Sequence, residues 1–194
     1  MKIGTQLRIL RKTNTILEYV IYGLCILVIV LPYVPKFSYW AEKYVFASVA
    51  DMSPETLPHF DLSVDKLYIP SIGVEKEIVE ATNMKQVHEK VWRRPQGSTP
   101  ANGSNTVLVA HRYATIGGNR ASTFYNLPEL AIGEKAYVVW QGKLYTYEVY
   151  ETATVEPSAT EIESLTPDAI LTLYTCTPLW TASHRYVVRA RLVP

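Results

Sequence analysis

Three residues in this sequence, Cys176, His111 and Arg185, could together carry out acyl transfer through a cysteine nucleophile. A thiolate attacks a carbonyl carbon, an imidazole passes protons in both directions near neutral pH, and a guanidinium stays charged while it donates to a developing oxyanion. Each residue alone also fits a structural role, since a free cysteine is often a small buried apolar group and an arginine a solvated charge. All three occur at the ends of predicted strands, and this shared position favours a role in chemistry.

The strands that must position these residues are visible in the sequence pattern. Residues 171–176 alternate between two sets of side chains with a period of two, which predicts a strand, and Pro178 ends it because proline cannot donate a ladder hydrogen bond. Residues 186–192 form a second predicted strand, which Arg185 opens. Residues 106–111 are nearly all apolar, which predicts a strand buried on both faces that ends at His111.

Short predicted strands and frequent turns continue through residues 65–194, and they indicate a mostly β barrel or sandwich. Before residue 104 the other predicted elements are a strand at 67–70, a turn at 72–74 leading into 77–80, a helical turn through Met84, Val87 and Val91 with Asn83 as its cap, and a loop at 95–103. After it they are a flexible segment at 117–119, a short helix or turn at 124–130, and a hairpin of 136–140 with 144–155. A polar loop at 156–168 with one helical turn around Ile162 completes the set.

The N-terminal part of the chain predicts a membrane anchor. Residues 1–15 are polar and basic, whereas residues 16–35 are almost entirely apolar and long enough to span a bilayer as a helix. The positive-inside rule then places the N-terminus in the cytoplasm and the domain at 65–194 outside, with residues 36–64 as a connector. A cleaved signal peptide is the alternative, since residues 48–50 are small, but they lie well beyond the apolar run.

Composition excludes several other classes of function. Charged residues make up 19% of the chain and the net charge is +1, a balance that does not suggest a nucleic-acid partner. Cys25 lies within the apolar run, so the two cysteines do not form a disulfide framework. The remaining histidines, His59, His88 and His184, are weaker candidates for catalysis, and no Cys/His spacing or converging carboxylates predict a metal or another cofactor.

The order of these motifs resembles that of the sortase family, over most of residues 65–194. The resemblance is carried by Thr175-Cys176 preceded by Leu173 with Arg185 nine residues on, by residues 67–74, by residues 105–112, and by residues 124–127 followed by Gly133-Glu134. The motifs are short, but their order and spacing together are specific.

This resemblance implies an eight-stranded β-barrel with short helices behind one N-terminal transmembrane helix, and no cofactor. It implies that Cys176 attacks the Thr–Gly bond of a Leu-Pro-x-Thr-Gly-like sorting signal in surface proteins, that Arg185 stabilises the oxyanion, and that His111 protonates the leaving amine. The acyl group would then pass from the thioester to an amine of a cell-wall precursor or of a pilin lysine.

The subclass and two other classes of protein remain open alternatives. Residues 36–65 lack the Asp-Pro-aromatic lid motif of pilin-polymerising sortases, and a single N-terminal anchor fits housekeeping-like sortases, including classes D and E. Pilin polymerisation is the alternative within the family. A cell-wall hydrolase or cysteine protease usually has its cysteine before its histidine, and a non-catalytic binding domain would not need all three residues together.

Overall fold

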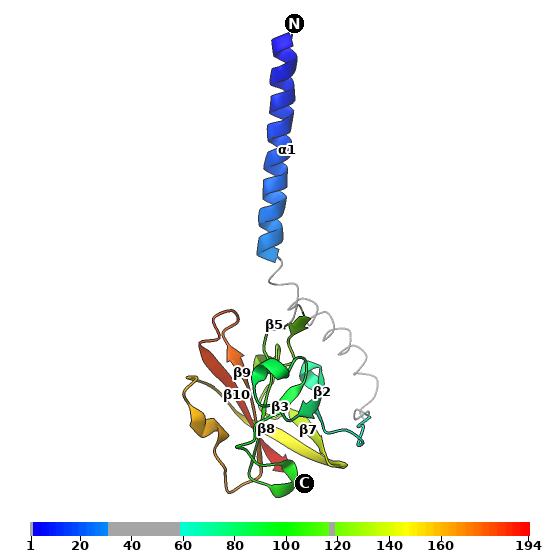
Figure 1. Ribbon diagram of the computed structural model, residues 1–194, viewed down its shortest axis with the longest axis vertical. Helices are drawn as coiled ribbons and strands as arrows, with labels where there is room; N and C mark the ends of the chain where they lie inside the picture. The colour runs from blue at the N-terminus through cyan, green and yellow to red at the C-terminus, as the bar shows by residue number, and fades with distance from the viewer. Residues whose placement is uncertain (1, 31–58, 117–118) are drawn as a thin grey trace. The chain divides into compact units, whose positions relative to one another are not determined.

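The computed structural model describes residues 2–30, 59–116 and 119–194, and the chain divides into two compact units, Met1–Leu57 and Pro58–Pro194 (Figure 1). In the first unit, helix α1 runs over Lys2–Val30. It is longer at its N-terminal end than the predicted apolar helix because residues 2–15 contain no proline, and it ends two residues before Pro32.

Within the described part of the chain, no helix is both long enough and apolar enough to cross a membrane. The predicted membrane segment reaches residue 35, and its residues 31–35 lie outside the described residues. The same holds for residues 36–58 of the predicted connector.

The second unit is built on a closed eight-stranded barrel, as the family resemblance implied. The strand order around it is β1-β2-β3-β4-β9-β10-β8-β7, and β1 closes the barrel against β7. Neighbouring strands are antiparallel except for β2 with β3 and β4 with β9. The barrel strands are β1 (Lys66–Ile69), β2 (Val74–Val79), β3 (Val91–Arg93), β4 (Asn105–Val109), β7 (Lys135–Trp140), β8 (Lys143–Val155), β9 (Ile170–Thr177) and β10 (His184–Val193).

Short elements connect the barrel strands. The predicted helical turn near Ile162 and the predicted turn at 124–130 are both confirmed as single 3-10 turns. These connecting elements are η2 (Pro70–Ile72), η3 (Met84–Gln86), η4 (Pro100–Asn102), β5 (Ala114–Ile116), β6 (Asn119–Ala121), η5 (Leu127–Glu129) and η6 (Thr160–Glu163).

Two local predictions were wrong. Val91 does not continue the helical turn that begins at Met84, because it opens β3 and is fully buried in the barrel core. Asn119 does not belong to an irregular flexible segment, because it pairs with Ile116 in the small antiparallel sheet of β5 and β6. In both places a short strand is specified by its partner strand rather than by its own sequence.

The barrel interior explains why the strands alternate as they do. Leu108, Leu171, Leu173 and Val188 are completely buried and belong to one cluster that fills the barrel. Successive side chains of a strand point to opposite faces, so the residues between them face away from this core. On β9 the outward set is Thr172, Tyr174 and Cys176, and these positions lead to the candidate site.

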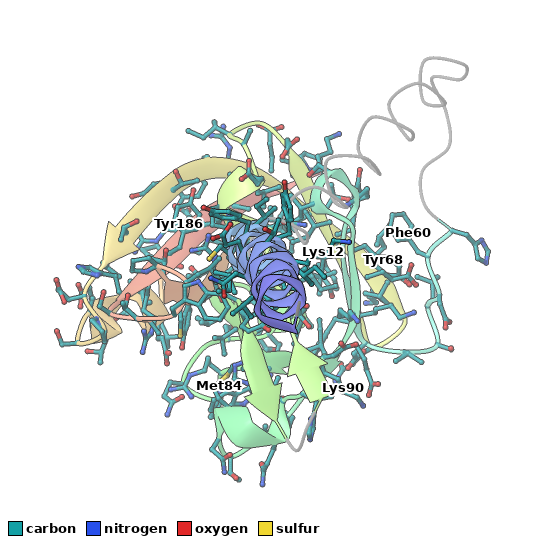
Figure 2. All side chains as sticks on the ribbon, turned by 90° about the horizontal axis from the view of Figure 1, so that it is seen from above. Lys12, Phe60, Tyr68, Met84, Lys90 and Tyr186 are labelled. Atoms are coloured by element: carbon teal, nitrogen blue, oxygen red, sulfur yellow. The ribbon has the colours of Figure 1, made fainter. Side chains whose placement is uncertain are left out.

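The outer face of the barrel is partly covered by the segment that precedes β1. Phe60 packs edge-on against Tyr68, with ring centroids 5.1 Å apart (Figure 2). It also packs against the tilted ring of Tyr137, with ring centroids 5.0 Å apart. The Asp65 carboxylate also accepts a hydrogen bond from the main-chain amide of Gln141 at 2.6 Å. Residues from about 60 onward therefore pack as part of the barrel unit.

Candidate active site

Cys176 and Arg185 are directly opposed on neighbouring strands. Strands β9 and β10 lie side by side (Figure 1). Their antiparallel register pairs Cys176 with Arg185, next to the pair of Thr175 with Tyr186. Directly opposed residues have their side chains on the same face of a sheet. Thr175 is buried, as expected for the inner face, and Cys176 is partly exposed on the outer one.

His111 is brought to the same rim by the parallel pairing of β4 with β9. The register runs from Asn105 with Ile170 to Val109 with Tyr174, and His111 and Cys176 each follow two positions after this last pair. The alignment continues beyond the end of β4, because Thr175 Oγ1 donates to the Ala110 carbonyl at 2.8 Å. The structure thus opposes Cys176 to Arg185 and ties the residue before His111 to the residue before Cys176.

The hydrogen bond of His111 fixes its tautomer. Its Nε2 lies 3.0 Å from the backbone carbonyl oxygen of Met84, and a carbonyl can only accept, so Nε2 carries a proton. Met84 also packs on the cluster that contains Val109 and Tyr174, which places it on the outer side of the sheet, where Cys176 also lies. Nδ1 is therefore the ring nitrogen left for proton transfer.

Arg185 is held by main-chain carbonyl groups rather than by an acid. Its Nη1 donates to the carbonyl oxygens of Ala182 at 3.2 Å and His184 at 3.0 Å. Among the described residues no carboxylate pairs with Arg185, so its charge is not cancelled by a counter-ion. A guanidinium in this state can donate to an oxyanion formed near the opposed Cys176.

The loop between β9 and β10 has a defined but unusual conformation. Trp180 and Ala182 have φ angles of 77° and 51°, a region that residues other than glycine rarely adopt. Contacts hold this backbone in place: the Ala182 amide donates to the Pro178 carbonyl at 3.0 Å, and the Trp180 ring lies 5.2 Å from that of Tyr113. The loop thus links the strand of Cys176 with the segment that follows His111.

A charged network fixes the polar loop at 156–168 to the barrel. Glu163 accepts from Arg94 Nε at 2.9 and 3.1 Å and from the Tyr174 hydroxyl at 2.6 Å. Burial raises the pKa of Tyr174, and the hydrogen bond to Glu163 raises this pKa further. The buried Asn105 amide also donates to the carbonyls of Ile162 and Ser164, so the loop is anchored at several points.

The other candidate residues do not join the site. His59 and His88 are exposed, and His184 binds Glu156 at 3.1 Å and contacts the Ser183 hydroxyl at 2.9 Å. Cys25 lies in α1, in the other unit. In the part of the chain that the structure describes, no three His, Cys, Asp or Glu side chains converge as metal ligands.

Sequence reasoning missed three partners of the site. The Met84 carbonyl and the side chains of Arg112 and Thr177 contact or flank the candidate residues, and Arg112 Nη1 donates to Thr177 Oγ1 at 2.7 Å. Only Arg112 carried a signal, as the residue after His111 in the family-like motif. No local pattern predicts a contact between positions so far apart in the chain.

The chain belongs to the sortase family, since the family model of the sortase domain matches residues 67–193. Among curated proteins it is similar to sortase A of Streptococcus agalactiae serotype III (strain NEM316), with 26% identity over 157 residues, which cover 77% of this chain and 63% of that protein. The chain thus spans less than two thirds of that relative's length.

Solved structures of two kinds of sortase resemble the fold equally well. Sortase A from Corynebacterium diphtheriae matches with a TM-score of 0.60 and 27% identity, over 68% of this chain and 60% of that one. Sortase C1 from Streptococcus agalactiae matches with a TM-score of 0.60 and 27% identity, over 67% of each chain.

Proposed function

We propose that this protein is a cysteine transpeptidase that cleaves the Thr–Gly bond of a Leu-Pro-x-Thr-Gly-like sorting signal and transfers the acyl part to an amine. The observation that carries the proposal is the place of Cys176 on β9, opposed to Arg185 of β10 on one side and, on the other, next to β4, the strand that leads into His111. Membership of the sortase family supports the same assignment. The product would be a surface protein attached to the cell wall.

The reaction proceeds through a thioester on Cys176. The Cys176 thiol gives its proton to Nδ1 of His111 as the sulfur attacks the threonine carbonyl carbon, and Arg185 donates to the oxyanion of the tetrahedral intermediate. The C–N bond then breaks as His111 delivers a proton from Nδ1 to the departing glycine amine. An incoming amine attacks the thioester carbonyl, His111 takes up its proton, and the thiolate leaves. The Met84 carbonyl keeps Nε2 protonated throughout, so only Nδ1 changes its proton.

Mass spectrometry tests this proposal directly. The full-length protein in detergent, incubated with a sorting-signal peptide, should gain the mass of the peptide up to its threonine, on the fragment that contains Cys176. Adding hydroxylamine should release the acyl group as a hydroxamate, which distinguishes transpeptidation from simple hydrolysis. Cleavage that never yields a hydroxamate would indicate a protease, and binding without an adduct would indicate a non-catalytic domain.

Attachment to the cell membrane, with the N-terminus in the cytoplasm and the barrel outside, forms part of the proposal. Its support is the apolar run in residues 16–35 behind a basic N-terminal segment. The apolar side chains of α1, such as Tyr19 and Val28, are well exposed in the described helix, at 72% and 68%. Fractionation of cells should place the protein in membranes and release it only with detergent, whereas release by alkaline carbonate would contradict an anchor.

Pilin polymerisation is the second candidate, and the likeness to sortase C1 of Streptococcus agalactiae favours it. The two candidates differ only in the amine that resolves the thioester. A competition between a pilin-type lysine peptide and a cell-wall stem peptide, at equal concentrations, separates them. We expect the cell-wall amine to be used faster, in line with a housekeeping-like sortase.

A further inference from the structure

The parallel ladder between β4 and β9 ends before it reaches His111 or Cys176. Its last pair is Val109 with Tyr174. The carbonyl of His111 accepts from the Phe124 amide at 2.9 Å, so the main chain has turned away from β9 at this point. The relative position of the two residues must therefore be fixed by contacts other than the ladder.

Two side-chain hydrogen bonds replace the ladder, one before His111 and Cys176 in the sequence and one after them. Before them, Thr175 Oγ1 donates to the Ala110 carbonyl at 2.8 Å. After them, Arg112 Nη1 donates to Thr177 Oγ1 at 2.7 Å. Both bonds join residues 65 positions apart, so they hold the same register that would place His111 beside Cys176.

The environment of Arg112 is costly for a cation that serves only packing. Its Nε is buried without a hydrogen-bond partner, and among the described residues no carboxylate lies within ion-pair distance. Burial lowers the pKa of Arg112, although Tyr125, Glu129 and Tyr186 oppose that shift. A partly buried, unpaired charge is poor evidence for a role in stability, since apolar replacements of such groups are often neutral or stabilising.

We propose that Arg112 is a positioning residue that, through Thr177, holds the His111 segment in register with Cys176 for thioester formation. It does not touch the reacting atoms, because Thr177 and Thr175 alternate with Cys176 along β9 and have their side chains on the other face. The inference rests on the proposed function and adds to it a residue with a separate, measurable role. Misplacement of a catalytic group by about 1 Å can cost about a hundredfold in rate.

The test compares Arg112→Met with the wild-type full-length protein in single-turnover acylation by a sorting-signal peptide. We expect the acylation rate at saturating peptide to fall by about ten- to a hundredfold, with the half-saturating concentration unchanged within about twofold. The melting temperature should stay the same or rise, because a buried charge has been removed. Arg112→Lys keeps a donor and should recover part of the rate.

A double-mutant cycle identifies the partner. Thr177→Val should lower the acylation rate to a similar extent, and the double variant should be no slower than Arg112→Met alone, because both changes break the same hydrogen bond. Arg189→Met is the matched control: Arg189 also has a buried Nε without a partner, but it lies further along β10 and pairs with Glu151 at 3.2 Å. Its acylation rate should be that of the wild type.

Several outcomes would overturn the inference. They are an unchanged rate in Arg112→Met, additive losses in the double variant, a change confined to the half-saturating concentration, or a loss of rate that parallels a loss of stability. If the wild-type protein itself forms no thioester, the proposed function fails, and this inference fails with it.

Discussion

The outer face of β9 has two polar sites with opposite character. At Tyr174 the hydroxyl, the Glu163 carboxylate and the Arg94 guanidinium bind one another, with side chain joined to side chain at every step. At Cys176, two residues further on, the hydrogen bonds of the Arg185 and His111 side chains within the described part of the chain go to main-chain carbonyls. The charges of the first site neutralise each other within the fold, whereas the side chains of the second remain able to interact with a substrate.

This difference has an energetic meaning. A carboxylate that accepts from two donors is stabilised where it lies, and removing one partner leaves the others unsatisfied. Carbonyl partners orient an imidazole or a guanidinium without neutralising it, so the group can still respond to charge on a substrate. The comparison predicts that changes at the Cys176 end affect rate and changes at the Tyr174 end affect stability.

The largest effect is expected from Cys176→Ala, which should abolish thioester formation because it removes the sulfur that forms the thioester. Cys25→Ala serves as the control, since Cys25 lies in α1 and should not affect turnover. Mass spectrometry of the acyl-enzyme measures both variants. Peptide trapped covalently on the Cys176→Ala protein would remove the basis of the comparison.

Next in size is Arg185→Lys, which keeps the charge but loses the planar fork of donors. Loss of an oxyanion donor typically costs about 3–4 kcal/mol, or a hundred- to a thousandfold in rate. The pH–rate profile should keep its shape, because arginine does not titrate in the working range. Single-turnover acylation measured across pH gives both quantities.

His111→Ala, compared with Arg185→Lys, should instead remove the limb of the pH–rate profile that the imidazole contributes. It should slow both acylation and resolution, since each step moves a proton. Two results would show that the residues do not have separate roles. One is a pH–rate profile of Arg185→Lys shifted by a whole pH unit, and the other is a profile of His111→Ala with both limbs intact.

At the other end of β9, Glu163→Gln should mainly reduce stability. It leaves Arg94 without its counter-charge, and these two side chains are only 22% and 16% exposed. We expect unfolding in urea to show a loss of about 1–3 kcal/mol. Acylation by the folded protein should fall far less than in Arg185→Lys, and an equal fall would mean that the two sites are not separate.

The smallest effect concerns Tyr174 at high pH. Its pKa is raised by burial and by Glu163, so the folded state keeps a proton that the unfolded chain releases above about pH 10. Stability should therefore decline as pH rises beyond that point, with a slope of about 1.4 kcal/mol per pH unit from this residue. Tyr174→Phe should lessen the decline, which denaturant titrations between neutral and alkaline pH would show.

Sequence patterns predicted the barrel well where a strand carries its own signal. Residues 171–176 alternate clearly, and 106–111 form a continuous apolar run, so β9 and β4 were both anticipated. The strands β3, β5 and β6 have three residues each, and so few residues cannot show a period. Pairing with longer neighbours stabilises β3, and β5 and β6 pair with each other.

The candidate site was predicted in its residue types but not in its supports. Cys176, His111 and Arg185 have chemistry that a sequence displays, and a family resemblance ordered them. The Met84 carbonyl that orients His111 belongs to the backbone, so its residue type gives no signal. The bond of Arg112 to Thr177 depends on the register of two strands, which follows from packing across the whole barrel.

The place of β10 in the barrel has a consequence for folding. Among the described barrel strands it comes after all the others in sequence, yet it lies between β9 and β8 and pairs with both. Until it docks, each of those strands has an open edge that is free to pair with another chain. Cys176 also lacks its opposed arginine until then, so the nucleophile acquires this partner only when β10 pairs with β9.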